Sequence, residues 1–299
     1  MDEGYEPLVA HSGREALETR WRGFDAGQGD GVTFATVLKW AKDAMPKALP
    51  NTPFPFAHCR DLLTGPRAAP WLIRHWLEAG SLALIFGEST AGKTFVVLDW
   101  ACCVATGTPW NNRPVRQGSV FYIAGEGRGG LGKRLAAWGQ HHGLDMAGHP
   151  LFVSERGASL LDAIEAENIA DAIRSLAAEH GEPALVVVDT LHRNLGQGDE
   201  NSAEDVAAFL RNIDQSIRLP LGCAVLVVHH PGHGDKTRSR GSYAIKAALD
   251  AEFCLAINGD VRDLECTKQK DSEPPAPVHL ASQVVRLPPP WEEDGEAMT

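Results

Sequence analysis

From Trp71 onward, short apolar runs alternate with longer segments in which apolar residues recur every three to four positions. The short runs predict buried strands, and the longer spacing predicts helices that pack against a sheet. This alternation is typical of a parallel sheet with helices on both faces. The predicted strands are Leu82–Phe86, Ser119–Ala124, Leu151–Val153, Ala184–Asp189, Cys223–His229, Ala251–Ile257, Val261–Lys268 and Val278–Leu287.

Two helices can be placed within this pattern. The segment that starts at Gly92 is apolar on nearly all sides, which predicts a helix buried at the centre of the fold. The segment Glu204–Ile217 carries its apolar residues on one stripe, which predicts a surface helix facing the sheet. Ser202, with Asp205 three residues later, predicts a capping box at the start of that helix.

Composition divides the chain into four parts. Residues 1–50 have a helical pattern, and residues 51–70 are rich in proline, which is typical of a linker or an extended strap. Residues 71–288 hold the alternating pattern, and residues 289–299 form an acidic tail that we expect to be loosely ordered. The sequence therefore predicts one large domain with a smaller helical piece in front of it.

The overall composition is that of an ordinary globular protein. The 299 residues are 43% hydrophobic, no apolar run is long enough to span a membrane, and the N-terminus has no signal-peptide pattern. Six cysteines show no C-x-x-C spacing, and Cys102 and Cys103 fall inside the buried helix, so we expect reduced thiols and a cytoplasmic protein. With a net charge of −11, any contact with nucleic acid must come from local basic loops.

The clearest motif lies between the first predicted strand and the buried helix. Residues 87–94 read GESTAGKT and fit the phosphate-binding loop G-x-x-x-x-G-K-[ST] without a mismatch. Backbone N–H groups of such a loop surround the β-phosphate, Lys93 reaches the β- and γ-phosphates, and Thr94 offers its hydroxyl to Mg²⁺. We therefore expect ATP and Mg²⁺ as cofactors. The predicted nucleotide-binding residues are Gly87, Glu88, Ser89, Thr90, Ala91, Gly92, Lys93, Thr94 and Phe95.

Two acidic residues at other strand ends are candidates for the remaining chemistry. Asp189 ends an apolar strand, where it would hold the water shell of Mg²⁺. The next residue is Thr190, whereas ATPases that place the catalytic carboxylate beside the metal aspartate have Asp-Glu here. Glu126, just past the strand Ser119–Ala124, would instead orient and deprotonate the attacking water. A kinase needs no such group, so the pattern favours hydrolysis.

The segment after the strand Cys223–His229 combines a histidine with basic residues. His229 ends the strand, where a polar side chain would contact the γ-phosphate and report its loss. Lys236, Arg238 and Arg240 follow in a glycine-containing loop, which suits contacts with the phosphate backbone of DNA. A solvated charged loop, or a metal site built on the neighbouring histidines, would give the same pattern, and both stay open.

Lys268 and Lys270, at the end of a late predicted strand, lie two residues apart and therefore on the same face. In a ring of subunits they would reach the γ-phosphate of a neighbouring subunit and act as arginine fingers do. Ordinary surface lysines at a strand end explain the pattern equally well.

Together these segments resemble the RecA-like ATPases, particularly the RepA-type hexameric replicative helicases of plasmids and phages. The resemblance covers about Phe54 to Leu287 and runs through GESTAGKT, YIAGEGRGG, ALVVVDT, VLVVHHPGHGDKTRSRGS and TKQKD. It implies an α/β fold, with a RecA-like P-loop core whose mostly parallel central sheet is flanked by helices, plus a short N-terminal helical piece.

The resemblance also implies roles for single residues. It makes Glu126 the catalytic base, Asp189 the residue that holds the metal shell, and His229 the γ-phosphate sensor, while Lys93 and Thr94 bind phosphates and Mg²⁺. Arg240 resembles the arginine finger that acts on a neighbouring subunit, with Lys268 and Lys270 as possible companions. This assignment leaves Lys236 and Arg238 for DNA.

The N-terminal segment LETRWRGFDAGQGDGVTFATVLKWAKDA resembles the end of the primase C-terminal type 2 domain. The sequence thus leads us to expect a Mg²⁺-ATP-dependent helicase that forms a ring, expected to be a hexamer, moves on single-stranded DNA and belongs to a primase–helicase. Two alternatives stay open: a non-translocating RecA-like recombination or regulatory ATPase, and a P-loop kinase for a small molecule.

Overall fold

The computed structural model describes residues 58–60, 71–125, 127–230 and 243–288, together with two short strands in the C-terminal tail. By its contacts the chain divides into two units, Met1–Pro66 and Arg67–Thr299. The helical piece expected at residues 1–50 lies outside the described residues, as does most of the strap. The fold reported below is that of the second unit.

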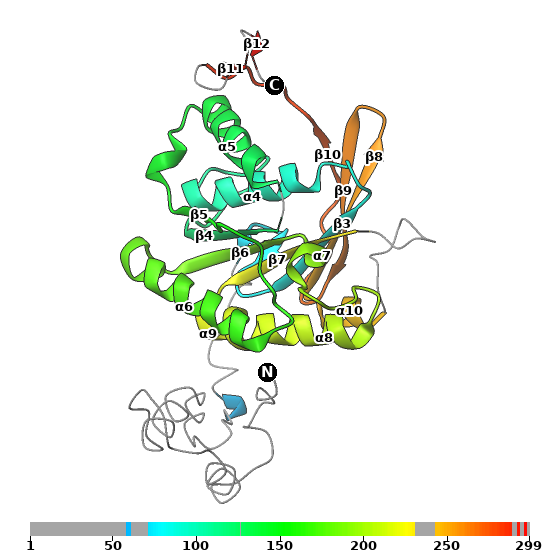
Figure 1. The fold of residues 1–299 in the computed structure, drawn as a ribbon. Coiled ribbons are helices and arrows are strands. Elements are labelled where there is room, and N and C mark those ends of the chain that lie inside the picture. The colour runs from blue at the N-terminus through cyan, green and yellow to red at the C-terminus, as the bar shows by residue number, and fades with distance from the viewer. Residues whose placement is uncertain are drawn as a thin grey trace, which may run out of the picture. The chain divides into compact units, whose positions relative to one another are not determined.

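An eight-stranded sheet forms the centre of this unit, in the order β10–β9–β8–β3–β7–β6–β4–β5 (Figure 1). The strands from β8 to β5 pair in parallel, and β9 pairs antiparallel with both of its neighbours. The predicted, mostly parallel sheet is therefore confirmed. Its strands are β3 (Leu82–Gly87), β4 (Ser119–Ala124), β5 (Leu151–Val153), β6 (Pro183–Asp189), β7 (Ala224–His229), β8 (Ala251–Asn258), β9 (Val261–Gln269) and β10 (Val278–Ala281).

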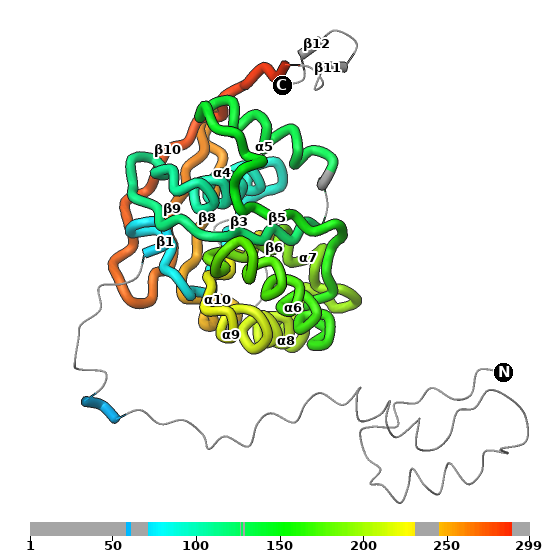
Figure 2. Tube along the Cα trace, turned by 90° about the vertical axis from the view of Figure 1, so that its left-hand side faces the viewer, coloured from blue at the N-terminus to red at the C-terminus, as the bar shows by residue number. Residues whose placement is uncertain are grey.

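Helices cover both faces of the sheet, as the alternating pattern predicts. Two helices, α4 and α5, lie on one face, and α6, α8, α9 and α10 lie on the other (Figures 1 and 2). Two buried apolar clusters, one on each face, fill the space between helices and sheet. The helices are α4 (Lys93–Thr106), α5 (Arg128–His142), α6 (Ala163–His180), α7 (Leu191–Asn194), α8 (Ala203–Asn212), α9 (Leu219–Leu221) and α10 (Tyr243–Ala248), with a 3₁₀ turn at Met146–Gly148 and a π-helical turn at Ile213–Arg218.

The buried helix is α4, and an aromatic cluster holds it in place. Trp100 on α4 meets Trp76 and Trp110 edge to face, with ring centroids 6.2 and 5.3 Å away. Asp99, a polar residue on this helix, accepts hydrogen bonds from the indole nitrogens of Trp110 (2.9 Å) and Trp138 (2.7 Å). Buried aromatic rings of this size bring a large apolar area out of water, so they fix α4 against the sheet.

Apart from shifts of one residue at strand ends, the structure differs from the sequence-based prediction at a hairpin, at the end of a helix and at the last strand. A small hairpin, β1 (Trp71–Ile73) with β2 (Leu77–Glu78), was not predicted, because its strands are too short to show a period. The predicted helix over Glu204–Ile217 ends as an α-helix at Asn212 and continues as the π-helical turn. The last strand was predicted to reach Leu287 but ends at Ala281. Its partner β9 begins at the residue that pairs with Ala281, so no pairing strand remains beyond it.

The start of α8 confirms one half of the predicted capping box. The Ser202 hydroxyl accepts a hydrogen bond from the Asp205 N–H at 3.2 Å, which satisfies one orphan donor of the helix. The Asp205 carboxylate accepts instead from the backbone N–H of Asp199, at 2.8 Å. The reciprocal bond of a capping box is therefore replaced by one that closes the preceding turn.

The C-terminal tail contains two short strands, β11 (Glu292–Glu293) and β12 (Glu296–Ala297), that pair antiparallel with each other. Among the helices that the structure describes, none is long and apolar enough to cross a membrane.

Candidate nucleotide-binding site

Most of the predicted site residues that the structure describes meet at the carboxyl ends of neighbouring parallel strands, and Lys268 and Lys270 do not. The phosphate-binding loop follows β3, His229 ends the adjacent strand β7, and Asp189 ends β6, the next strand along. The register confirms that these ends are level, since Phe86 pairs with His229 and Asp189 pairs with Val228. This edge is where ligands bind in open parallel sheets.

The loop itself requires glycine at both ends. A Cβ atom on Gly87 would lie 2.3 Å from the carbonyl oxygen of Leu255 on β8, so only glycine lets β3 pass this close to its neighbour. Gly92 has φ 94°, in the left-handed region that favours glycine, and α4 begins at the next residue. The N-terminus of α4 therefore opens onto the loop, as an anion site requires.

Lys93 lies inside the loop and is almost fully buried, with 7% of its surface exposed. Its ammonium donates to the carbonyl oxygens of Gly87 (2.8 Å) and Glu88 (2.9 Å). Burial lowers the pKa of Lys93, while the nearby Asp189 carboxylate works in the opposite direction. The ammonium is thus held by weak acceptors at the place where the stronger acceptors of a phosphate would bind.

Thr94 and Asp189 lie in direct contact. The Thr94 hydroxyl donates to Asp189 Oδ2 at 2.9 Å, although the two residues are far apart in the sequence. A hydroxyl and a carboxylate at this separation supply the hard oxygen ligands that Mg²⁺ prefers. The pair therefore fits the metal that accompanies a bound nucleoside triphosphate.

Tyr122, on β4, belongs to the same constellation and was not predicted. Its hydroxyl donates to Asp189 Oδ2 at 2.6 Å, and the side chain is buried. Burial first, and then the Asp189 carboxylate, raise the pKa of Tyr122 well above its ordinary value, so the phenol keeps its proton. In the sequence Tyr122 is the one hydroxyl-bearing ring of a largely apolar strand, and the sequence pattern alone does not connect it to Asp189.

Glu126, the predicted base, lies outside the described residues, but the residue before it is described. The Gly125 N–H donates to the Asp189 carbonyl oxygen at 2.7 Å. A Cβ on Gly125 would lie 2.4 Å from Cβ of Arg193, so glycine is required for this approach. The chain just before Glu126 is therefore fixed beside Asp189.

Thr190, which stands where other ATPases have glutamate, is used to start a helix. Its hydroxyl accepts from the N–H of Arg193 at the start of α7, at 3.5 Å. Its carbonyl oxygen accepts from the side-chain amide of Asn194 at 2.9 Å. This position thus supplies a helix cap and no carboxylate.

His229 is fully buried at the end of β7, between the strand of the loop and the strand of Asp189. The basic residues that follow it, Lys236, Arg238 and Arg240, lie outside the described residues. The alternative of a metal site stays open, because its residues His233 and Asp235 also lie outside the described residues. Within the described part of the chain, no group of three or more His, Cys, Asp or Glu residues is placed to hold an ion.

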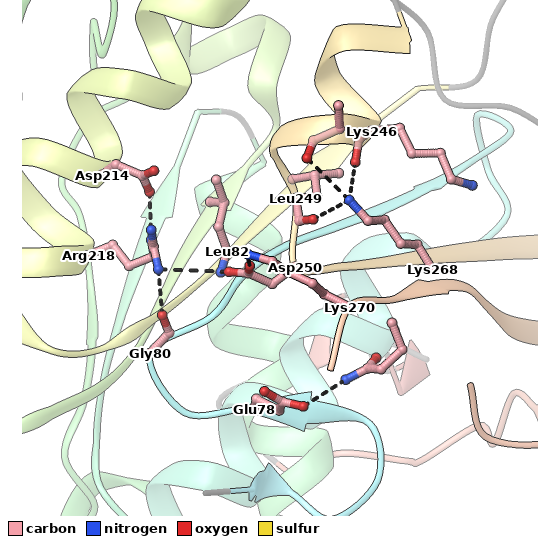
Figure 3. A network of polar contacts seen from close by, with 12 residues as sticks. Glu78, Gly80, Leu82, Asp214, Arg218, Lys246, Leu249, Asp250, Lys268 and Lys270 are labelled. Carbon is pink, nitrogen blue, oxygen red and sulfur yellow. Dashed lines mark hydrogen bonds and ion pairs between the residues drawn. The ribbon is translucent and has the colours of Figure 1, made fainter. Parts of the chain in front are cut away.

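Lys268 and Lys270 lie at the opposite end of the sheet from the loop. Figure 3 shows the contacts of Lys268. The Lys268 ammonium donates to carbonyl oxygens at the end of α10, among them those of Lys246 and Leu249. Burial lowers the pKa of Lys268, and Lys270 pairs with Asp250 at 3.2 Å. Action of either lysine on a neighbouring subunit stays a prediction, and for each it requires release of the contact seen here.

Phe95, one of the predicted nucleotide-binding residues, lies beside Arg134, which the sequence did not single out. The Phe95 ring is 59% exposed although it follows the loop directly, and the Arg134 guanidinium lies 4.5 Å from its centroid. Arg134 is carried by α5, and its charge also acts on Tyr122. In the sequence Arg134 is one of several basic residues after Glu126, and nothing in the pattern distinguishes it.

Comparison with known proteins agrees with this geometry. The family model described as an AAA domain matches residues 50–236, which is more than half of the chain. The match includes the phosphate-binding loop, Asp189 and His229. No curated protein matches the sequence.

Proposed function

The chain belongs to the AAA domain family of P-loop ATPases, and we propose that it is a Mg²⁺-ATP-dependent DNA helicase of the RepA type. In this proposal subunits form a ring, expected to be a hexamer, that moves along single-stranded DNA. The helicase acts in replication of the phage or plasmid type, as part of a primase–helicase. ATP is its substrate, and Thr94 with Asp189 holds the Mg²⁺ that accompanies it.

One observation supports this proposal most directly: β4 ends beside Asp189, while the residue after Asp189 is a helix cap. The Gly125–Asp189 hydrogen bond of 2.7 Å brings the chain before Glu126 to the edge where the γ-phosphate would lie. A carboxylate at this place, across the sheet edge from the loop, suits a base that activates water. Glu126 then takes the proton of the attacking water, which is the step that a kinase lacks.

The other groups hold the reactants in place. Mg²⁺, when bound, neutralises charge on the β- and γ-phosphates. Lys93 exchanges the two loop carbonyls for phosphate oxygens, a stronger charge-assisted contact. Tyr122 fixes the Asp189 carboxylate through its 2.6 Å hydrogen bond. His229, at the end of β7, senses whether the γ-phosphate is present.

Two features support a ring and a DNA substrate. The protein carries a net charge of −11, yet Lys236, Arg238 and Arg240 concentrate positive charge in one segment, as a loop facing the channel of a ring would. A γ-phosphate in the site needs a further cation, because negative charge develops on it during the reaction. Arginine fingers supplied by a neighbouring subunit raise the rate of such reactions by about 10³–10⁵-fold. Arg240 is the proposed finger, which leaves Lys236 and Arg238 for the DNA backbone.

Unwinding of a forked DNA duplex by the purified protein tests the proposal. We expect strand separation that needs both ATP and a single-stranded tail, and that Lys93→Ala abolishes. Rings that hydrolyse ATP without separating strands would contradict the helicase and favour a regulatory or recombination ATPase. Phosphate transfer to a small molecule, without hydrolysis in its absence, would contradict both.

A further inference from the structure

A side chain from outside the phosphate-binding loop holds the backbone of the loop. Arg262, on β9, donates from Nε to the carbonyl oxygen of Ala91 at 3.1 Å. Its Nη1 donates to the carbonyl oxygens of Gly259 (3.2 Å) and Val261 (3.0 Å) at the turn between β8 and β9. One guanidinium therefore links the phosphate-binding loop, at Ala91, to the β8–β9 hairpin by hydrogen bonds.

The direction of this bond determines where the next N–H group points. In a planar trans peptide the C=O and N–H groups point in opposite directions. Arg262 holds the Ala91 carbonyl toward the hairpin, so the N–H of Gly92, in the same peptide unit, points to the other side. That side is the start of α4, where the N–H groups of the loop and helix would surround a phosphate.

The backbone geometry around the Ala91–Gly92 peptide favours a flip of this peptide when Arg262 does not hold it. Gly92, which follows Ala91, has φ 94°, and Thr90, which precedes Ala91, has φ 69°. The backbone on both sides of Ala91 therefore occupies the left-handed region. Glycine adopts either sign of φ at little cost. A flipped Ala91–Gly92 peptide would aim a carbonyl oxygen at the phosphate, and only the unflipped fraction of molecules would bind.

We propose that Arg262 is a positioning residue that orders the phosphate-binding loop for the triphosphate group. The proposal rests on nucleotide binding by the loop and is independent of movement on DNA. Because Arg262 acts on the backbone that binds phosphate, its loss weakens the binding of every ligand that carries a triphosphate group, whichever base the ligand has. A fall in the competent fraction to about one tenth would raise the apparent Kd about tenfold.

Isothermal titration calorimetry with ATP, GTP and inorganic tripolyphosphate tests this role in the full chain. We expect Arg262→Ala to weaken the binding of all three about tenfold, the size of one charge-assisted hydrogen bond. In steady-state hydrolysis KM should rise by a similar factor while kcat at saturating ATP changes little. Arg262→Lys, which keeps a donor, should recover part of the affinity.

Asn258→Ala provides the matched control, because it loosens the same turn without touching the loop. The Asn258 side chain donates to Asp263 at 2.8 Å, and its removal should leave all three affinities unchanged. Equal losses of ligand affinity in Asn258→Ala and Arg262→Ala would mean that Arg262 only stabilises the hairpin. If Arg262→Ala does not fold, the same affinities are measured with Arg262→Lys. Affinities of Arg262→Lys equal to those of the wild type would then contradict the proposal.

Two other outcomes would overturn the inference in different ways. Loss of affinity for one nucleotide, with tripolyphosphate binding unchanged, would make Arg262 a contact to base or ribose. Unchanged affinities in Arg262→Ala would leave the loop correctly ordered without it. Failure of the wild-type protein to bind any of the three ligands would overturn nucleotide binding itself, and with it the proposed function.

Discussion

At the scale of single residues, the site is organised around one carboxylate oxygen. Asp189 Oδ2 accepts hydrogen bonds from Thr94 at 2.9 Å and from Tyr122 at 2.6 Å. Thr94 would leave this contact to bind Mg²⁺, whereas the ring of Tyr122 packs in the buried core and its hydroxyl holds the carboxylate. Groups that orient a metal-binding carboxylate typically change metal affinity by about 10–100-fold.

Tyr122→Phe should therefore weaken the use of Mg²⁺ and leave the fold intact. The ring that packs in the core stays, and only the hydroxyl is lost. We expect the Mg²⁺ concentration for half-maximal ATP hydrolysis to rise by about tenfold. Nucleotide binding measured without Mg²⁺ is the control and should not change. An unaltered Mg²⁺ dependence would show that Asp189 needs no support from Tyr122.

The sequence predicts some of these residues and not others, for a physical reason. Lys93 and Thr94 follow from a continuous motif, and Asp189 follows from its place at the end of an apolar strand. Tyr122 and Arg262 act through contacts that depend on which strands become neighbours. That order is decided by the packing of the whole sheet, so no local pattern shows that they face the site.

At the scale of elements, the C-terminal end of helix α10 is held by a lysine from the strand β9. The last carbonyl groups of a helix lack intrahelical partners, and a cation at this end is favourable. Lys268 supplies it from β9 (Figure 3). The same lysine is a candidate finger for a neighbouring subunit, so its substitution separates an anchoring role from a catalytic one.

Lys268→Ala should lower the stability of the isolated subunit, because the end of α10 loses its cation. We expect a loss of about 1–2 kcal/mol, or a fall in Tm of about 2–8 °C, measured by circular dichroism. Lys270→Ala is the matched control, since its exposed pair with Asp250 contributes little. Equal Tm values for Lys268→Ala and wild type, with a large loss of kcat, would favour the finger instead.

Elements differ in how well their sequence predicts them. The strands β4 and β5 were predicted with their observed bounds, because each is a short, largely apolar run, fully buried in β4 and half-buried in the edge strand β5. The end of β10 was not predicted, because it depends on where its partner β9 begins. The π-helical turn after α8 keeps the apolar stripe of a helix, so hydrophobic periodicity does not reveal it.

At the scale of the whole molecule, the layers are predictable but the assembly is not. Helices on both faces of a parallel sheet follow from the alternating pattern, and the two buried clusters confirm it. Association depends on surfaces whose partners the chain alone does not supply. The proposal that subunits share an active site therefore rests on the chemistry of the γ-phosphate and on the resemblance to ring helicases.

Mixing two inactive variants tests this shared site most directly. Glu126→Gln removes the proposed base, and general-base loss typically costs about 10²–10⁴-fold in rate. Arg240→Ala removes the proposed finger, so each variant alone should be nearly inactive. In mixed rings, confirmed by native mass spectrometry, some interfaces join an intact base to an intact finger, and we predict that ATP hydrolysis is partly restored. No restoration in such rings, or wild-type activity that does not change with protein concentration, would contradict a shared site.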